Sequence, residues 1–284
     1  MPRFLKLFDE CNLKATFFVV ANDFVGSNQN REILRDIISR GHEVANHSLN
    51  HEFAFSSLSR HDKEADIINS TDIIKDACGV LPRGFRIPGY DIDEVTIDIL
   101  DKNGYLYDSS LYKFPLYPFL RRLAYMKIKG VLKNPIFNNL TEETYRILQS
   151  PIMPYHPVYG KFWRVGKTER KILEMPVSVI PLLCLPFNST FLFLSGRPLF
   201  ELGLWMTEKM GIDLNYNFHS TDMLSSINDD VHVKHPGIGL DYKKKFFIFK
   251  NMISRIRRAY NFITLEELAK KSYHECGKAH GSNK

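Results

Sequence analysis

Short apolar runs alternate with amphipathic segments along the first hundred residues. Residues 14–20 (KATFFVV) are rich in β-branched and aromatic side chains, which predicts a buried strand. Residues 30–40 place isoleucine and leucine on one helical face, and a glycine suited to a helix end follows them. Further strands are expected at 43–46, 84–88 and 105–109, and further helices at 59–78 and 93–102. This order predicts an α/β fold in which helices cover a parallel sheet.

The second half of the chain is less regular. Residues 112–171 contain six prolines and no clear alternation, which predicts an irregular insertion within a single domain spanning residues 1–275. The apolar stretch 175–194 has the length of a membrane span, but three prolines interrupt it, so we expect buried strands and turns. The remaining expected elements are strands at 172–179, 214–218 and 262–265, helices at 197–210, 242–260 and 266–273, and a disordered tail at 276–284.

Composition narrows the class of protein. The chain has 284 residues, of which 44% are hydrophobic and 25% charged, values that are typical of a globular domain and exclude a disordered or fibrous chain. The formal charge of +6 is mild, and a solvated helix face explains the basic C-terminal region better than nucleic-acid binding does. The four cysteines are far apart and predict no disulfide framework. With neither a signal peptide nor a transmembrane segment recognised, a cytoplasmic location is the default expectation, and the oligomeric state stays open.

Three polar clusters follow predicted strands. They are the segments 46–51 (NHSLNH), 86–90 (RIPGY) and 108–110 (DSS). Active residues of parallel α/β folds gather at the C-terminal ends of strands, so we expect these clusters to share one edge of the sheet.

His47 and His51 form the strongest local signal. Two histidines four residues apart can bind one metal ion if the segment is helical, whereas in an extended strand they would lie about 13 Å apart. A shared metal therefore requires a helical turn directly after the strand 43–46, which side-chain bonds of Ser48 and Asn50 are able to hold. The alternative is a pair of surface histidines in a loop.

Arg86 and His219 are two further candidates for a catalytic role. Arg86 ends a strand, where a buried guanidinium needs a carboxylate or an oxyanion as its partner, and an ordinary salt bridge explains it equally well. His219 ends the predicted strand 214–218 and is suited to act as a general acid beside Asp222, although a structural histidine is the simpler interpretation of that residue alone.

Taken together, these motifs resemble the polysaccharide deacetylases of the NodB-homology type, carbohydrate esterase family 4. The resemblance rests on the order of ATFF, HSxxH, RxP, YDSS and a late histidine, and it covers about residues 1–110 and 172–272. The stretches 84–90 (GFRIPGY), 107–111 (YDSSL) and 174–178 (EMPVS) are more similar to the branch found in bacterial exopolysaccharide gene clusters.

The resemblance implies a distorted (β/α) barrel and a metal-dependent hydrolase that removes N-acetyl groups from a glycan. It implies that His47 and His51 bind a divalent metal, zinc by preference, together with one aspartate. Arg86 would orient the catalytic base, and His219 would protonate the leaving amine. It further suggests a substrate-binding role for four residues: Pro88, Gly89, Tyr90 and Asp108.

One motif of the family is missing from this sequence. A strand ending in TFDDG, which supplies the base and the third metal ligand, should precede residues 7–18, and Asp9 and Glu10 do not replace it. We therefore expect a barrel without its first strand, weak zinc binding and impaired catalysis. Either the start of the domain lies upstream, or the chain is a degenerate relative that binds a glycan without hydrolysing it. A related amidohydrolase that acts on a small amide stays a further alternative.

Overall fold

The computed structural model describes residues 1–120, 146–166, 169–231 and 235–281, with side chains up to residue 273. Contacts divide the chain into two compact units. Unit 1 comprises residues 1–15 and 177–263, and unit 2 comprises residues 16–176 and 264–284. Each unit is described by itself, and the single domain predicted for residues 1–275 stays a prediction.

Unit 2 contains a parallel sheet in the order β1-β2-β3-β4-β5. The strands are β1 (Thr16–Val19), β2 (Glu43–Asn46), β3 (Gly84–Phe85), β4 (Tyr107–Asp108) and β5 (Leu173–Glu174). The connecting helices are α2 (Asn28–Ser39), α3 (Arg60–Cys78) and α4 (Glu94–Lys102). This confirms the predicted α/β class, whereas the prediction that the barrel lacks its first strand stays untested.

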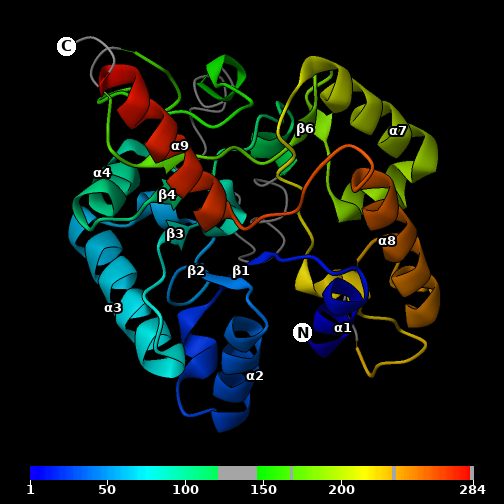
Figure 1. Ribbon diagram of the computed structural model, residues 1–284. Coiled ribbons are helices and arrows are strands. Elements are labelled where there is room, and N and C mark those ends of the chain that lie inside the picture. Colours follow the sequence, from blue (N-terminus) through cyan, green and yellow to red (C-terminus); the bar gives the residue numbers. More distant parts are fainter. Residues whose placement is uncertain (121–145, 167–168, 232–234, 282–284) are drawn as a thin grey trace. The chain divides into compact units, whose positions relative to one another are not determined.

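Local signals set the helix boundaries in unit 2. The Ser59 hydroxyl accepts a hydrogen bond from the backbone N–H of Asp62, so α3 begins where the sequence predicts, and Gly79 ends it at a φ of 77°. Asp93 caps α4 in the same way through the N–H of Thr96. Helices α2 and α3 lie side by side against β2 (Figure 1).

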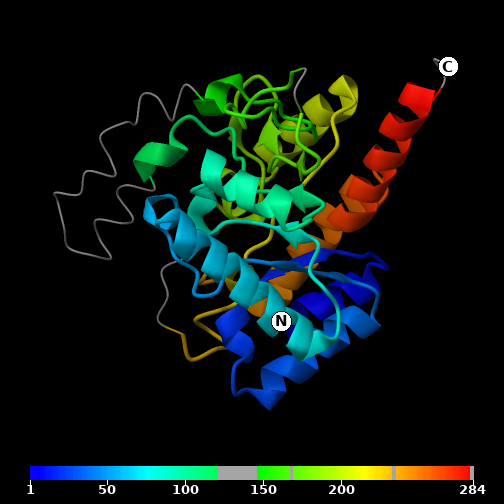
Figure 2. The same ribbon diagram turned by 90° about the vertical axis from the view of Figure 1, so that its left-hand side faces the viewer.

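The last helix corrects the predicted strand at 262–265. Helix α9 (Leu265–Gly281) begins directly after Thr264, whose hydroxyl accepts from the N–H of Glu267 while the Glu267 carboxylate accepts from the N–H of Thr264. This reciprocal capping fixes a helix start at the point where the apolar pattern suggested a strand. Figure 2 shows α9 as a long helix that leads to the C terminus, so it enters the segment 276–284 for which the sequence predicts a tail.

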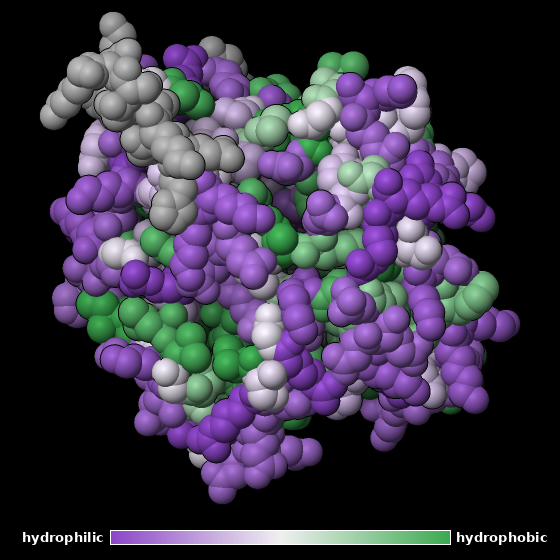
Figure 3. Space-filling view, viewed as in Figure 1, coloured by the Kyte–Doolittle hydropathy of each residue, from purple (hydrophilic) through white to green (hydrophobic). Residues whose placement is uncertain are grey.

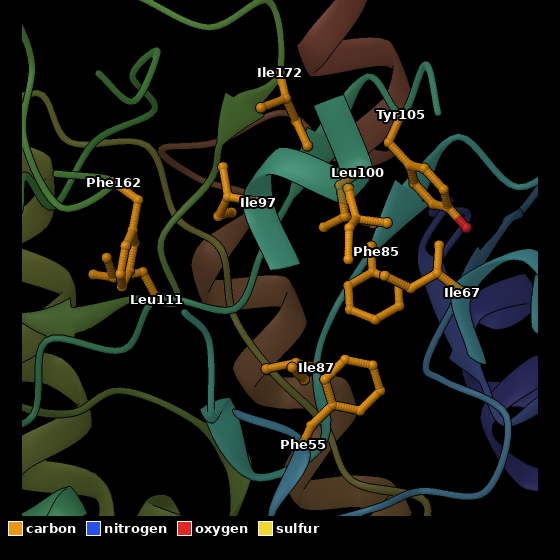
Figure 4. Packing of buried hydrophobic residues seen from close by; sticks show 11 residues of the cluster. Phe55, Ile67, Phe85, Ile87, Ile97, Leu100, Tyr105, Leu111, Phe162 and Ile172 are labelled. Carbon is orange, nitrogen blue, oxygen red and sulfur yellow. The ribbon is translucent and has the colours of Figure 1, made fainter. Parts of the chain in front are cut away.

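A continuous apolar core supports the strand ends of unit 2. Phe85, Ile97 and Leu100 are fully buried, and the Phe85 ring meets the Tyr105 ring edge to face at 6.0 Å. Figure 4 shows how these side chains converge from β3, α4 and the segment that precedes β4. Phe162 joins the same cluster, so part of the predicted insertion 112–171 belongs to the core; its residues 121–145 lie outside the described part of the chain.

Unit 1 contains a short antiparallel hairpin and three helices among its described residues. The hairpin pairs β6 (Val179–Ile180) with β7 (Leu185–Pro186), and the helices are α1 (Pro2–Glu10), α7 (Ser189–Met210) and α8 (Tyr242–Ile256). The hairpin agrees with the strands and turns expected at 175–194. However, Asn188 caps a helix that begins at Ser189, eight residues before the expected one, and Gly196 kinks it.

The predicted strand 214–218 is not a strand in the structure. Only a single parallel bridge joins Asn217 to Asn188. The apolar residues of this segment are packing residues instead, because the Phe218 ring lies 5.6 Å from Phe4 and 5.3 Å from Phe249 in edge-to-face contacts. The apolar residues of segment 214–218 therefore indicate packing in an aromatic cluster and not a strand.

The surface agrees with a globular composition. Hydrophilic side chains cover most of the face shown in Figure 3, and the hydrophobic residues there form separate patches. Among the helices that the structure describes, none is both long and apolar enough to cross a bilayer.

Candidate functional site

The polar clusters of unit 2 share one edge of its sheet. The segment NHSLNH continues from β2, RIPGY continues from β3, and DSS continues from β4. The strands are parallel and in register, so their C-terminal ends bring these three segments together, as the sequence predicts.

The turn that carries the two histidines is not helical, which corrects the expected geometry. Ser48 and His51 both have positive φ angles, 68° and 58°, so the chain reverses sharply instead of forming a helical turn. The Ser48 hydroxyl accepts from the backbone N–H of His51 at 3.0 Å, and Asn46 Oδ1 accepts from the N–H of Ser48 at 2.9 Å. The expected side-chain support by Ser48 is therefore present in a different kind of turn.

The two imidazoles nevertheless lie in contact, edge to face. Their ring centroids are 5.0 Å apart, and the rings are nearly perpendicular. His47 Nδ1 lies 2.6 Å from the carbonyl oxygen of Arg86, and because a carbonyl only accepts, Nδ1 must carry the proton. If His47 binds a metal, it would do so through Nε2. Burial lowers the pKa of His51, which favours the neutral form that a metal requires.

The two imidazoles are suited to be two of the ligands of a zinc ion. Histidine pairs oriented through a backbone carbonyl are common at zinc sites. Among the residues that the structure describes, no group of three or more histidine, cysteine, aspartate or glutamate side chains is placed to hold a metal. The pair therefore lacks a third protein ligand within the described part of the chain.

Arg86 is held next to this turn by backbone and hydroxyl groups. Its Nε donates to the carbonyl oxygen of Ser109 at 2.8 Å, and its Nη2 donates to the Ser109 hydroxyl at 2.6 Å. The guanidinium carbon lies 4.1 Å from the centre of the Phe18 ring, a cation–π contact. Burial lowers the pKa of Arg86, and these contacts fix its direction. Its role in orienting a base stays a prediction.

Asp108 forms an acid pair with Glu174. The two residues are register partners on β4 and β5, their exposed fractions are 0% and 1%, and each carboxyl group affects the pKa of the other. Both Asp108 oxygens accept from Ser110, at 2.7 and 3.0 Å, and Glu174 Oε1 accepts from the N–H of Leu111 at 3.0 Å. Burial raises the pKa of both groups, and that of Glu174 well above its usual range. A substrate would reach Asp108 only if the side chains around it moved.

The other predicted substrate contacts lie in the turn after β3. Pro88 is buried, whereas Gly89 and Tyr90 both have positive φ angles, 63° and 53°. The Tyr90 ring packs 4.9 Å from Tyr112 and 5.3 Å from Tyr117. The turn is thus rigid and lies next to the histidine loop, but its contact with a substrate stays a prediction.

His219 belongs to unit 1 and is exposed. Its backbone N–H donates to Asp222 Oδ2 at 2.6 Å, and its Nδ1 lies 3.1 Å from the Thr190 hydroxyl. Asp222 is fully buried and also contacts His235, with 3.2 Å between Asp222 Oδ1 and Nε2. The expected carboxylate therefore lies near His219 but accepts from its main chain. The role of His219 as an acid stays a prediction.

Sequence analysis missed Phe53 as a candidate site residue. Phe53 follows His51 by two residues, its ring centroid lies 4.8 Å from that of His51, and 41% of the residue is exposed. An aromatic residue in a turn gives no distinguishing sequence signal, because only the tertiary structure shows that it is exposed beside the histidines.

Comparison with known proteins shows what part of this chain is similar to. Residues 1–107 match the family model for polysaccharide deacetylase. A peptidoglycan deacetylase of Helicobacter pylori is 30% identical over 124 residues, which are 44% of this chain and 41% of that protein. A chitin deacetylase of Cryptococcus neoformans is 32% identical over 93 residues, 33% of this chain and 19% of that protein. The matches thus span less than half the length of these curated relatives.

A solved structure extends the likeness of the fold to nearly the whole chain. A probable polysaccharide deacetylase from Pseudomonas aeruginosa PAO1 is 16% identical and covers 96% of this chain and 72% of its own, with a TM-score of 0.59. At that identity the likeness concerns the fold, and it confirms the NodB-type α/β class.

Proposed function

We propose that this chain, whose residues 1–107 match the family model for polysaccharide deacetylase, contributes to the metal-dependent removal of N-acetyl groups from a glycan. The observation that carries the proposal is the histidine pair after β2. Two imidazoles in contact, one of them oriented by the Arg86 carbonyl, are a ligand arrangement for zinc. The family match and the order of the motifs support the same reaction class.

Zinc bound at this pair would supply a Lewis acid for amide hydrolysis. His47 and His51 would hold it through ring nitrogens. The fixed guanidinium of Arg86 would orient an acidic group through hydrogen bonds, and His219 would give a proton to the leaving amine. Among the residues that the structure describes, none completes a set of three metal ligands with the pair. We propose that zinc binding and hydrolysis by these 284 residues are impaired for this reason.

A glycan-binding relative without hydrolytic activity is the second candidate. The lack of a third metal ligand among the described residues favours it. In that case the site would still bind the sugar but would not release acetate.

Two measurements separate these candidates. Calorimetry with zinc should show weak binding that His47→Ala and His51→Ala abolish, whereas His61→Ala, an exposed histidine on α3, should leave it unchanged. Binding tighter than micromolar that survives His47→Ala would refute the metal assignment. Acetate release from N-acetylglucosamine oligomers should be far below that of an active deacetylase. Release at a normal rate would overturn the proposed impairment.

A further inference from the structure

The inward face of α3 carries polar residues where an ordinary amphipathic helix would be apolar. Lys63, Asp66 and Ser70 follow one another at spacings of three and four, so they lie on one face of the helix. Lys63 and Ser70 are buried, and Asp66 is half-buried. Burying polar groups costs free energy unless they are hydrogen-bonded. The hydrogen-bond partners of these side chains therefore indicate which segments the helix holds.

Two of these side chains hold the turn that carries the histidine pair. Asp66 Oδ1 accepts from the backbone N–H of Leu49 at 3.0 Å, and Leu49 lies midway between the two histidines in the sequence. Ser70 Oγ accepts from Asn46 Nδ2 at 2.7 Å, directly before the first histidine. Helix α3 thus anchors the turn at its start and at its centre.

The turn needs such anchors because its backbone is strained. Ser48 and His51 have φ angles of 68° and 58°, and a positive φ at a residue other than glycine persists only where the surrounding contacts hold it. On one side, the carbonyl oxygen of Ser48 accepts from the N–H of Ala21 at 3.1 Å. The Asp66 carboxylate provides the acceptor for the N–H of Leu49. Removing that carboxylate would take a hydrogen bond from the middle of the strained segment.

The surroundings of Asp66 oppose its charge. Burial is the main cause that raises the pKa of Asp66 to about 6, and the Glu52 carboxylate acts in the same direction. The hydrogen bond from the Leu49 N–H lowers the pKa, so this bond favours the charged form. A carboxylate that is unfavourable where it lies, and that meets the chain between two candidate metal ligands, is typical of a residue that serves a site.

We propose that Asp66 is a positioning residue of the candidate metal site: through Leu49 it fixes the directions of the two imidazoles and so sets their affinity for zinc. This inference rests on the proposed function, because it takes His47 and His51 as zinc ligands. Groups that orient metal ligands from outside typically change the metal affinity by about 10- to 100-fold when they are removed. The hydrogen bond to Leu49 is the means by which Asp66 acts, so an acceptor at position 66 is what the site requires.

The test combines zinc calorimetry on the full chain with amide hydrogen exchange at Leu49, followed by nuclear magnetic resonance without zinc. Asp66→Ala should weaken zinc binding about tenfold and speed this exchange about tenfold. Asp66→Leu, which keeps the bulk but has no acceptor, should do the same. Asp66→Asn should keep both values close to those of the unchanged chain, because its amide oxygen accepts from the same N–H.

Two control variants separate positioning from charge and from stability. Glu64→Ala removes an exposed carboxylate from the same helix and should change neither zinc binding nor exchange at Leu49. Ser59→Ala removes the hydroxyl that caps α3, so it should lower the urea midpoint without changing the zinc affinity. A purely structural role of Asp66 would follow the pattern of Ser59→Ala.

Each outcome decides the inference. Unchanged zinc affinity in Asp66→Ala or Asp66→Leu would overturn it, and so would a loss in Asp66→Asn as large as that in Asp66→Ala, because charge and not position would then matter. Unchanged exchange at Leu49 in Asp66→Ala would show that the carboxylate does not hold the turn. If the unchanged chain binds no zinc, the metal site of the proposed function is wrong, and the inference about affinity falls with it. If zinc binds through the histidines whatever stands at position 66, the proposed function stands and this inference fails.

Discussion

The buried acid pair on β4 and β5 should make the protein less stable as the pH rises. Burial raises the pKa of Glu174 well above its usual range, and the Asp108 carboxyl group adds to the shift. In the folded state the pair therefore keeps a proton that the unfolded chain releases above about pH 4.3. Folding then takes up one proton, so the free energy of unfolding falls by about 1.4 kcal/mol per pH unit until the folded pair also ionises.

Glu174→Gln should remove this slope. Glu174 Oε1 accepts from the N–H of Leu111, while Oε2 has no donor among the described residues. A glutamine can keep the first bond and place its amide N–H toward Asp108, where the shared proton was. Arg86 and Tyr155 are the other ionisable groups that face the pair, and the variant leaves both in place.

The measurement is urea unfolding at about pH 5 and about pH 6, followed by tryptophan fluorescence. Between these values the unchanged protein should lose about 1.4 kcal/mol relative to Glu174→Gln. A Trp205→Phe background leaves Trp163 of unit 2 as the reporter, and Glu64→Gln on the exposed side of α3 is the matched control. Other shifted groups, such as Asp66 with a pKa of about 6, cancel in the difference. Parallel pH curves for the two proteins would refute the shared proton.

Three shorter predictions test the fold and the site. Gly84→Ala would place a Cβ 2.0 Å from the Tyr107 ring and should lower the free energy of unfolding by about 3 kcal/mol or more. Gly239→Ala, where a Cβ would meet open space, should lower it by well under about 1 kcal/mol. Equal urea midpoints for the two variants would contradict this packing. Ser59→Ala should cost about 1 kcal/mol in the same assay by removing the cap of α3, and no loss would argue against that cap. Zinc should protect His47 from carbethoxylation, detected by peptide mass spectrometry; equal labelling with and without zinc would argue against its role as a ligand.

The sequence by itself determined the elements whose signals are local. Helix α3 begins after Ser59 and ends at Gly79, because a hydroxyl cap and a glycine at positive φ act within one helical turn. The order of strands and helices over residues 16–108 was predictable because each element buries one apolar face. That order also placed His47, Arg86 and Asp108 at one edge of the sheet.

The tertiary structure decided what depends on distant partners. The predictions of strands at 214–218 and 262–265 were wrong because an apolar pattern alone does not identify a strand. The first segment packs in an aromatic cluster, and the second leads into the capped start of a helix. Ser48 and His51 adopt positive φ angles, which are uncommon for residues other than glycine, so the sequence could not predict the turn that brings the two imidazoles together. Asp108 and Glu174 lie 66 positions apart in the sequence and meet only because β4 and β5 pair in register, and local patterns carry no information about such a register.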